Sequence, residues 1–116
     1  MKRNVALMIS LLLAMGLSVE AQEGFTGPGL SPVTVEEAKN LRDDDPVVLQ
    51  GKITRFLGDE KYLFSDDTGT IRVEIDNRLW RGFSVGENDL VEITGEIDKN
   101  FTRVEVEASG IKKIER

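Results

Sequence analysis

The residues of this chain that could do chemistry are basic and aromatic side chains near two expected turns. Tyr62 follows Lys61 directly, and Phe101 lies two positions before Arg103. An aromatic ring beside a guanidinium or ammonium group can stack on a planar group and clamp an anionic one. The candidate ligand-binding residues are therefore Arg55, Lys61, Tyr62, Arg72, Glu74, Phe101 and Arg103, with Phe64 as a further candidate.

A solvated sheet face would show the same residue types. Arg72 and Glu74 are two positions apart, so on one strand they share a face. Exposed pairs of opposite charge are common on sheets and contribute little to stability. The pattern alone therefore leaves open whether these side chains bind a ligand or only form cross-strand pairs in solvent.

The composition excludes several kinds of active site. The 116-residue chain has no histidine and no cysteine, so it lacks the usual general base, a thiolate nucleophile and the commonest transition-metal ligands. Its acidic residues fall in turns or on the polar side of alternating strands, whereas carboxyl pairs that do acid–base catalysis need a sheltered pocket. We expect a protein that is not an enzyme and that has neither a cofactor nor a metal site.

The charge balance argues against a nucleic-acid partner. The chain has 15 basic and 21 acidic residues, a formal net charge of −6, whereas affinity for a phosphate backbone comes mainly from basic side chains. Capture of cationic peptides or metal ions by an acidic surface stays an alternative. The carboxylates expected on the outer faces of the last two strands are Glu92, Glu96, Asp98, Glu105 and Glu107.

The first 21 residues have the three-part layout of a secretory signal. Lys2 and Arg3 precede an uncharged apolar run, Val5–Leu17, that is shorter than the roughly 20 residues of a membrane-spanning helix. Small side chains favour cleavage after Ala21. We therefore expect a cleaved signal over residues 1–21, a flexible lead-in over 22–33 and a folded domain over 34–116. The expected product is a periplasmic monomer that is not inserted in a membrane.

The spacing of apolar residues predicts a short helix followed by strands. Thr34 and Glu37 fit a capping box that begins a helix over Val35–Leu41, and Pro46 ends it. Beyond Pro46 the apolar residues recur with a period of two, which predicts strands. Gly51 inside the first strand favours a bulge or a sharp bend.

The alternation also predicts which residues point into the core, except in the second strand, Tyr62–Phe64, where either face could be buried. A helical turn between the third and fourth strands would begin at Asp76 or Asn77 and end at Gly82, with Leu79 and Trp80 packed inward at the barrel end. The expected inward residues are Val47, Leu49, Gly51, Ile53, Ile71, Val73, Ile75, Val91, Ile93, Gly95, Ile97, Val104, Val106 and Ala108.

This order of elements is the pattern of an all-β fold, a small five-stranded OB-fold barrel with a short N-terminal helix and a short helix between strands 3 and 4. A five-stranded open sandwich is the alternative. OB barrels bind across strands 2 and 3, beside the loops that join strands 1 to 2 and 4 to 5, here Leu57–Glu60 and Lys99–Thr102. We expect strands 4 and 5 not to be neighbours, which would separate their carboxylates and weaken a metal site.

Several segments in a fixed order carry a resemblance to a known family. They are Gly24–Pro28, Val35–Lys39, Leu41–Asp44, Gly51–Ile53, Tyr62–Phe64, Asp67–Ile71, Val73–Asp76, Trp80–Gly82 and Val91–Lys99. In these segments the chain resembles the bacterial OB-fold family of exported stress-tolerance proteins, the YgiW/YdeI type. The resemblance implies a periplasmic, non-enzymatic OB barrel linked to tolerance of oxidants, metals or cationic antimicrobials.

Together these patterns predict a periplasmic OB-fold binding or stress-adaptor protein. Its partner would be an unknown small or charged ligand on the face of strands 2 and 3. The alternative is a protein–protein interaction module that docks an envelope protein through the same face.

Overall fold

The computed structural model describes residues 29–114. The expected signal segment and residues 22–28 of the expected lead-in lie outside the described residues. Among the residues that are described, no helix is long and apolar enough to cross a membrane. The elements in chain order are α2 (Val35–Ala38), β1 (Pro46–Gly58), β2 (Lys61–Asp66), β3 (Gly69–Glu74), the 3-10 turn η2 (Asn77–Leu79), β4 (Val91–Lys99) and β5 (Val104–Lys113).

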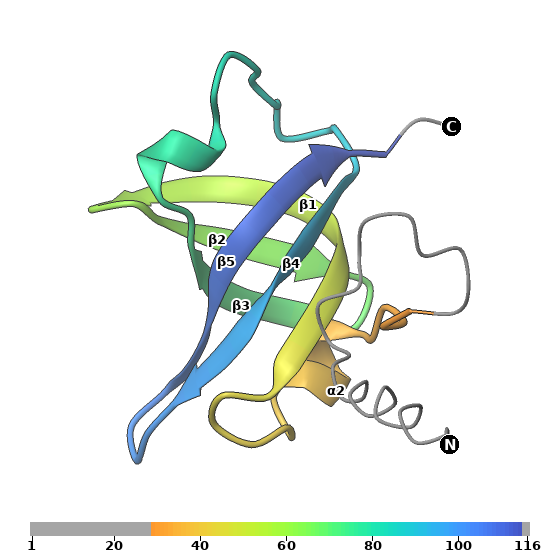
Figure 1. The fold of residues 1–116 in the computed structure, drawn as a ribbon, viewed down its shortest axis with the longest axis vertical. Coiled ribbons are helices and arrows are strands. Elements are labelled where there is room, and N and C mark those ends of the chain that lie inside the picture. The colour runs from red at the N-terminus through yellow and green to blue at the C-terminus, as the bar shows by residue number, and fades with distance from the viewer. Residues whose placement is uncertain (1–28, 115–116) are drawn as a thin grey trace, which may run out of the picture.

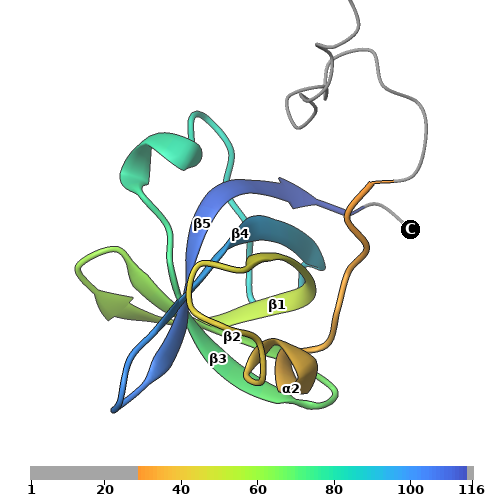
Figure 2. The ribbon, with the colours of Figure 1, turned by 60° about the horizontal axis from the view of Figure 1, so that its bottom comes forward.

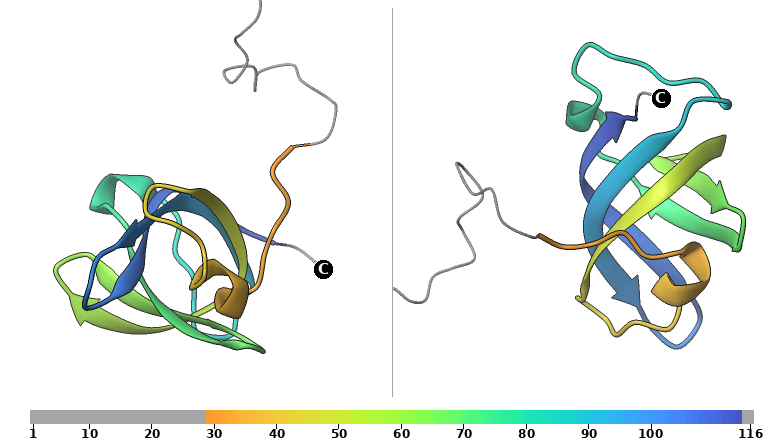
Figure 3. Two further views of the ribbon diagram at one scale, coloured as in Figure 1. Left: turned by 90° about the horizontal axis from the view of Figure 1, so that it is seen from below. Right: turned by 90° about the vertical axis from the view of Figure 1, so that its right-hand side faces the viewer.

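The five strands close into one barrel in the order β1-β2-β3-β5-β4 (Figures 1 and 3). Neighbouring strands are antiparallel except β3 and β5, which run parallel. β1 pairs with β4 through its first half and with β2 through its second half, so it closes the sheet. The predicted OB-type barrel is confirmed, and the open sandwich is excluded.

The expected separation of strands 4 and 5 is wrong. β4 and β5 pair along their length, from Val91 opposite Lys113 to Lys99 opposite Val104. β1 lies between β2 and β4, and β3 lies between β2 and β5, so closing the barrel makes β4 and β5 each other's remaining neighbours. The carboxylates of these two strands therefore lie on adjacent strands.

β1 is curved (Figure 2), and after Gly51 its pairing passes from β4 to β2. A Cβ atom at this position would overlap the carbonyl oxygen of Ser65 and lie 2.9 Å from the Phe64 ring. Glycine is therefore what lets the two strands approach so closely here. The irregularities in register occur later in β1, between Ile53 and Arg55 and beyond Phe56.

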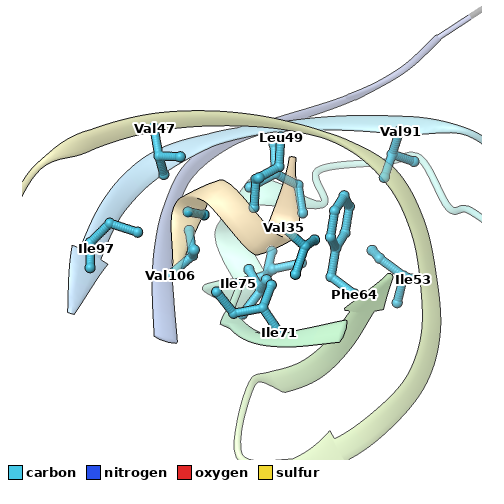
Figure 4. Close-up of a cluster of buried hydrophobic side chains, with 13 residues drawn as sticks. Val35, Val47, Leu49, Ile53, Phe64, Ile71, Ile75, Val91, Ile97 and Val106 are labelled. Carbon is cyan, nitrogen blue, oxygen red and sulfur yellow. The ribbon is translucent and has the colours of Figure 1, made fainter. Parts of the chain in front are cut away.

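The interior of the barrel is filled mostly by the residues that the alternation predicts (Figure 4). Phe64 is fully buried, so it is the residue of the second strand that faces the core. Phe64 is therefore wrong as a candidate ligand residue, because no ligand on the outer face could reach it. Val104 and Ala108 are only partly buried and pack against the edge of the core.

α2 begins at the predicted capping box but is shorter than predicted. Thr34 Oγ1 accepts from the Glu37 amide at 3.0 Å, and Glu37 Oε1 accepts from the Thr34 amide at 2.9 Å. The helix ends at Ala38. Beyond it, the Lys99 ammonium donates to the carbonyls of residues 39 and 41, at 3.1 and 2.8 Å. Turn hydrogen bonds continue past Ala38, from the amides of residues 40 and 41 to the carbonyls of residues 37 and 38, at 3.0 and 3.1 Å.

The predicted helical turn between β3 and β4 is η2, which ends at Leu79 instead of at Gly82 as predicted. Asp76 is its N-cap, and its carboxylate accepts from the Arg78 amide at 2.8 Å. Leu79 and Trp80 are partly buried and pack against the core from its edge.

A single carboxylate, Asp66, ties α2 to the turn between β2 and β3. Its Oδ2 atom accepts from the Val35 amide at 2.8 Å. Its Oδ1 atom accepts from the Thr68 amide at 2.8 Å, from the Thr68 hydroxyl at 2.6 Å and from the Gly69 amide at 3.2 Å. α2, whose Val35 and Ala38 are fully buried, is thereby held at one end of the barrel (Figure 3).

Replacing Asp66 by Ala should lower the free energy of unfolding by about 1 kcal/mol near neutral pH, as loss of a helix cap does. Partial burial acts to raise the pKa of Asp66, but the hydrogen bonds from Thr68, Val35 and Gly69 outweigh it and hold this pKa below its ordinary value of 3.8. The ionised form is therefore the stabilising one. Its contribution is fully present above pH 3.8 and is lost as the pH falls through the lowered, folded-state pKa.

Urea unfolding across the acid range measures this effect. The difference between the wild type and Asp66→Ala should shrink as the solution is acidified. Asp67→Ala, which removes the exposed neighbouring carboxylate on the same turn, is the matched control and should change stability little. A difference that stayed constant with pH would contradict the role of the Asp66 charge.

Candidate functional site

Five charged side chains converge on the outer face of β2, β3 and β5. Glu105 is only 3% exposed, and its carboxylate lies 2.9 Å from Lys61 Nζ, 3.5 Å from Arg72 Nε and 3.2 Å from Arg103 Nε. Glu74 lies 3.8 Å from Lys61 Nζ. These five residues are called the charge cluster below.

Strand register brings the charge cluster together. Lys61 of β2 lies opposite Glu74 of β3, and Arg72 of β3 lies opposite Glu105 of β5 in the parallel pair. Side chains alternate between the two faces of a strand. The cluster residues therefore point outward, whereas the intervening Val73 is fully buried in the core.

The three cations make the burial of Glu105 tolerable. A buried carboxylate without partners costs several kcal/mol, but here an ammonium and two guanidinium groups offset that cost. The side chains of Lys61, Arg72 and Arg103 are 25%, 41% and 56% exposed, so they face solvent as well as Glu105. With three positive and two negative groups, the cluster carries one net positive charge in an acidic chain.

One oxygen of Glu105 is incompletely satisfied. Oε2 lies within ion-pair distance of both Arg72 and Arg103, yet it is buried and accepts no hydrogen bond of good geometry from the described residues. Each guanidinium therefore keeps N–H groups that could donate to another acceptor.

The expectation of a solvated acidic face on the last two strands is wrong for Glu105. The alternation places it correctly on the outside of β5, but the cationic side chains of β2 and β3 cover it. Glu92 is instead paired at the surface, with Gln50 at 3.0 Å and Lys112 at 3.5 Å. Within residues 29–114, no group of three or more histidine, cysteine or acidic side chains is placed to hold a metal ion.

Four of the seven predicted ligand residues come together in the charge cluster. They are Lys61, Arg72, Glu74 and Arg103. Tyr62, Arg55 and Phe101 lie elsewhere. Tyr62 is paired with Val73 and so lies on the other face of β2, while Arg55 is exposed and has no partner in the cluster. Phe101 is fully exposed on the β4–β5 hairpin and lies near Arg42 and Asp43.

The other face of the β1–β2 hairpin carries a row of aromatic rings. Phe56 and Tyr62 have ring centroids 5.1 Å apart, Tyr62 and Trp80 5.8 Å, and Trp80 and Phe83 5.6 Å. These four residues line a groove of about 420 Å³, whose lining also includes Arg55, Ile53 and residues 84–87. It is called the aromatic groove below.

Glu60 fixes the two sides of the aromatic groove relative to each other. Its carbonyl accepts from the Ile75 amide at 2.8 Å, and its Oε2 atom accepts from the Asn77 amide at 2.8 Å. Both bonds run from the turn between β1 and β2 to the segment that leads into Trp80. The hairpin and the η2 segment lie next to each other in Figure 1 for this reason.

Sequence reasoning missed Phe56 and Phe83 as site residues. Phe56 could have been found, because residues on either side of a hairpin turn pair across it, and Phe56 lies opposite Tyr62. Phe83 lies in a segment without regular structure, where no periodicity indicates which way a side chain points.

Comparisons with known proteins agree with this fold. A sequence model of the bacterial OB fold (BOF) proteins matches residues 15–113. Protein YgiW of Escherichia coli strain K12 is 47% identical, with 98% of each chain covered. The calcium-regulated OB-fold protein CarO of Pseudomonas aeruginosa is 36% identical over 91% of this chain and 95% of that protein.

A solved structure of ygiW from E. coli is similar in three dimensions as well. The two structures superpose with a TM-score of 0.72 at 47% identity. The superposition covers 80% of this chain and 100% of the ygiW chain. The family match over most of the chain and this common barrel lead to one conclusion. The chain belongs to the bacterial OB fold (BOF) protein family.

Proposed function

We propose that this chain is a periplasmic, non-enzymatic binding protein of the cell envelope whose β2–β3 face takes a small anionic ligand. The observation that carries the proposal is the convergence of Lys61, Arg72 and Arg103 on one outward surface. Stress adaptation, which the family resemblance implies, would then follow from occupancy of this surface.

The position of the charge cluster supports the proposal. OB barrels bind ligands across strands 2 and 3, between the loops that follow strands 1 and 4. Lys61 is the first residue of β2 after the β1–β2 turn, and Arg103 directly precedes β5 after the β4–β5 turn. The cations therefore lie beside both flanking loops and on β3 between them.

The chemistry of the charge cluster favours an oxyanion. Arginine donates planar, paired N–H groups that match carboxylate and phosphate oxygens. Glu105 already occupies the inner side of the cations, so a ligand would approach from the solvent side and share them with it. Glu105 thus both positions the cations and competes with the ligand for them.

A short anion fits this surface better than a nucleic acid does. Single-stranded nucleic acids need stacking rings beside the cationic groove, but Tyr62 and its aromatic neighbours lie on the other face of β2. The net charge of −6 would also repel a long polyanion.

Replacing Arg72 by Gln should weaken binding of inorganic phosphate about threefold to tenfold, because one charge-assisted hydrogen bond is lost. Phosphate titration at low ionic strength, followed by amide chemical shifts, measures the affinity and locates the site. Wild-type shifts should centre on Lys61, Arg72 and residues 103–105, and added salt should weaken binding.

Arg78→Gln is the matched control for Arg72→Gln. Arg78 is an exposed arginine paired with Asp76 at 3.0 Å, outside the charge cluster, and its replacement should leave phosphate affinity unchanged. Equal losses in the two variants would argue against a defined anion site, as would phosphate shifts spread over the whole surface.

The proposed periplasmic location is tested separately, because it depends on the secretory signal expected in residues 1–21. When the full chain is produced in a Gram-negative bacterium, the protein released by osmotic shock should have the intact mass of a chain that starts at Gln22. Cleavage after Ala21 removes the apolar run together with Lys2 and Arg3. Retention of Met1 on the exported protein, or recovery only from the cytoplasm, would contradict periplasmic export.

A further inference from the structure

The aromatic groove is not explained by the proposed anion site. Its rings lie on the other face of β2 from Lys61 and Arg72, because Tyr62 is paired with the buried Val73. Phe56 is 62% exposed, although burying a phenylalanine side chain would stabilise the fold by about 2 kcal/mol. A large ring left at the open edge of an aromatic row suggests a surface that gains contacts from a ligand.

The groove is already held in shape by the chain itself. Asp59 and Glu60 have φ of 52° and 64°, and Arg81 has φ of 25°, conformations that cost non-glycine residues energy. These strained turns follow Phe56 and Trp80, respectively. The two hydrogen bonds that Glu60 accepts from Ile75 and Asn77 hold the first of them in place.

The geometry of the rings indicates the shape of the ligand. The planes of the Tyr62 and Trp80 rings meet edge-to-face at 61°. The Phe56–Tyr62 and Trp80–Phe83 pairs are tilted by 45° and 53°, and a further aromatic ring can extend such a row. The groove of about 420 Å³ lies within the range of small-molecule sites. A flat ring system would therefore contact Phe56, Tyr62 and Trp80 together.

Two polar features narrow the chemistry of the ligand. Trp80 Nε1 is buried and donates no hydrogen bond to any described residue. It is an unpartnered donor on a residue that lines the groove, and a ligand acceptor reaches it only if the indole rotates on binding. The charged residues of the lining, Arg55 and Glu87, have opposite signs. The groove therefore favours an uncharged molecule over the anion expected at the charge cluster.

We propose that the aromatic groove is a second binding site, independent of the charge cluster, for an uncharged planar aromatic molecule that carries a hydrogen-bond acceptor. Phe56 and Tyr62 contact the ring faces or edges, and Trp80 contacts the ring and donates its indole N–H. Glu60 is a positioning residue, since it acts by fixing the hairpin against the η2 segment.

The single tryptophan of the chain makes this site directly observable. Quinoline is a suitable probe, because at neutral pH it is an uncharged planar ring with one acceptor nitrogen. Titration of the full mature protein with quinoline should shift the Trp80 indole N–H resonance saturably and leave the amides of Arg72 and residues 103–105 in place. Naphthalene, which has the same shape without the acceptor, should bind more weakly at equal concentration.

Phe56→Ala should weaken quinoline binding about threefold to tenfold, the loss expected for one aromatic pair, with little change in thermal stability because the ring is already exposed. Phe101→Ala is the matched control: it removes another exposed ring, outside the groove, and should leave quinoline affinity unchanged.

The second site is ruled out if saturating quinoline leaves the indole resonance unshifted, or if the two phenylalanine variants lose affinity equally. Equal affinity for naphthalene would overturn the hydrogen bond assigned to Trp80. Because phosphate and quinoline report on different resonances, failure of this site and failure of the anion site are distinguishable.

Discussion

One buried carboxylate organises the outer face of the barrel. Lys61, Arg72 and Arg103 would repel one another at this spacing, and Glu105 among them turns that repulsion into attraction. The constraint behind it is the parallel pairing of β3 and β5, which places Arg72 beside Glu105. The burial of Glu105 is costly by itself, so the charge and the fold are coupled: the barrel aligns the cations, and the cations make the buried acid stable.

The alternation of side chains along β2 places charged residues on one face of the strand and aromatic residues on the other. Lys61 and Tyr62 are consecutive, so their side chains leave opposite faces of the strand. Lys61 joins the charge cluster, whereas Tyr62 joins the row of rings that continues to Trp80. The register between β1 and β2 is irregular beyond Ile53. Both faces of the β1–β2 hairpin are exposed near its tip. A small barrel can in this way present the proposed anion-binding site and the proposed aromatic site without a second domain.

The sequence predicted the barrel and most of its core because the period-two pattern is a local property of each strand. The capping box at Thr34 was likewise a local signal that the structure confirms. Gly51 marks a close approach of two strands, but the irregular register expected there occurs beyond Ile53. The adjacency of β4 and β5 was not predictable in this way, since it depends on how the whole sheet closes. The burial of Glu105 was missed because it depends on long side chains of neighbouring strands. Phe83 was missed because its segment has no regular period.

The most direct test of the account is the phosphate affinity of Glu105→Gln relative to the wild type. If Glu105 shares the cations with an external anion, the variant should bind phosphate about threefold to tenfold more tightly, because about 1 kcal/mol of competing interaction is removed. It should also unfold at a lower urea concentration, since three cations lose their counter-charge. A folded Glu105→Gln protein that binds phosphate no better than the wild type would contradict the account.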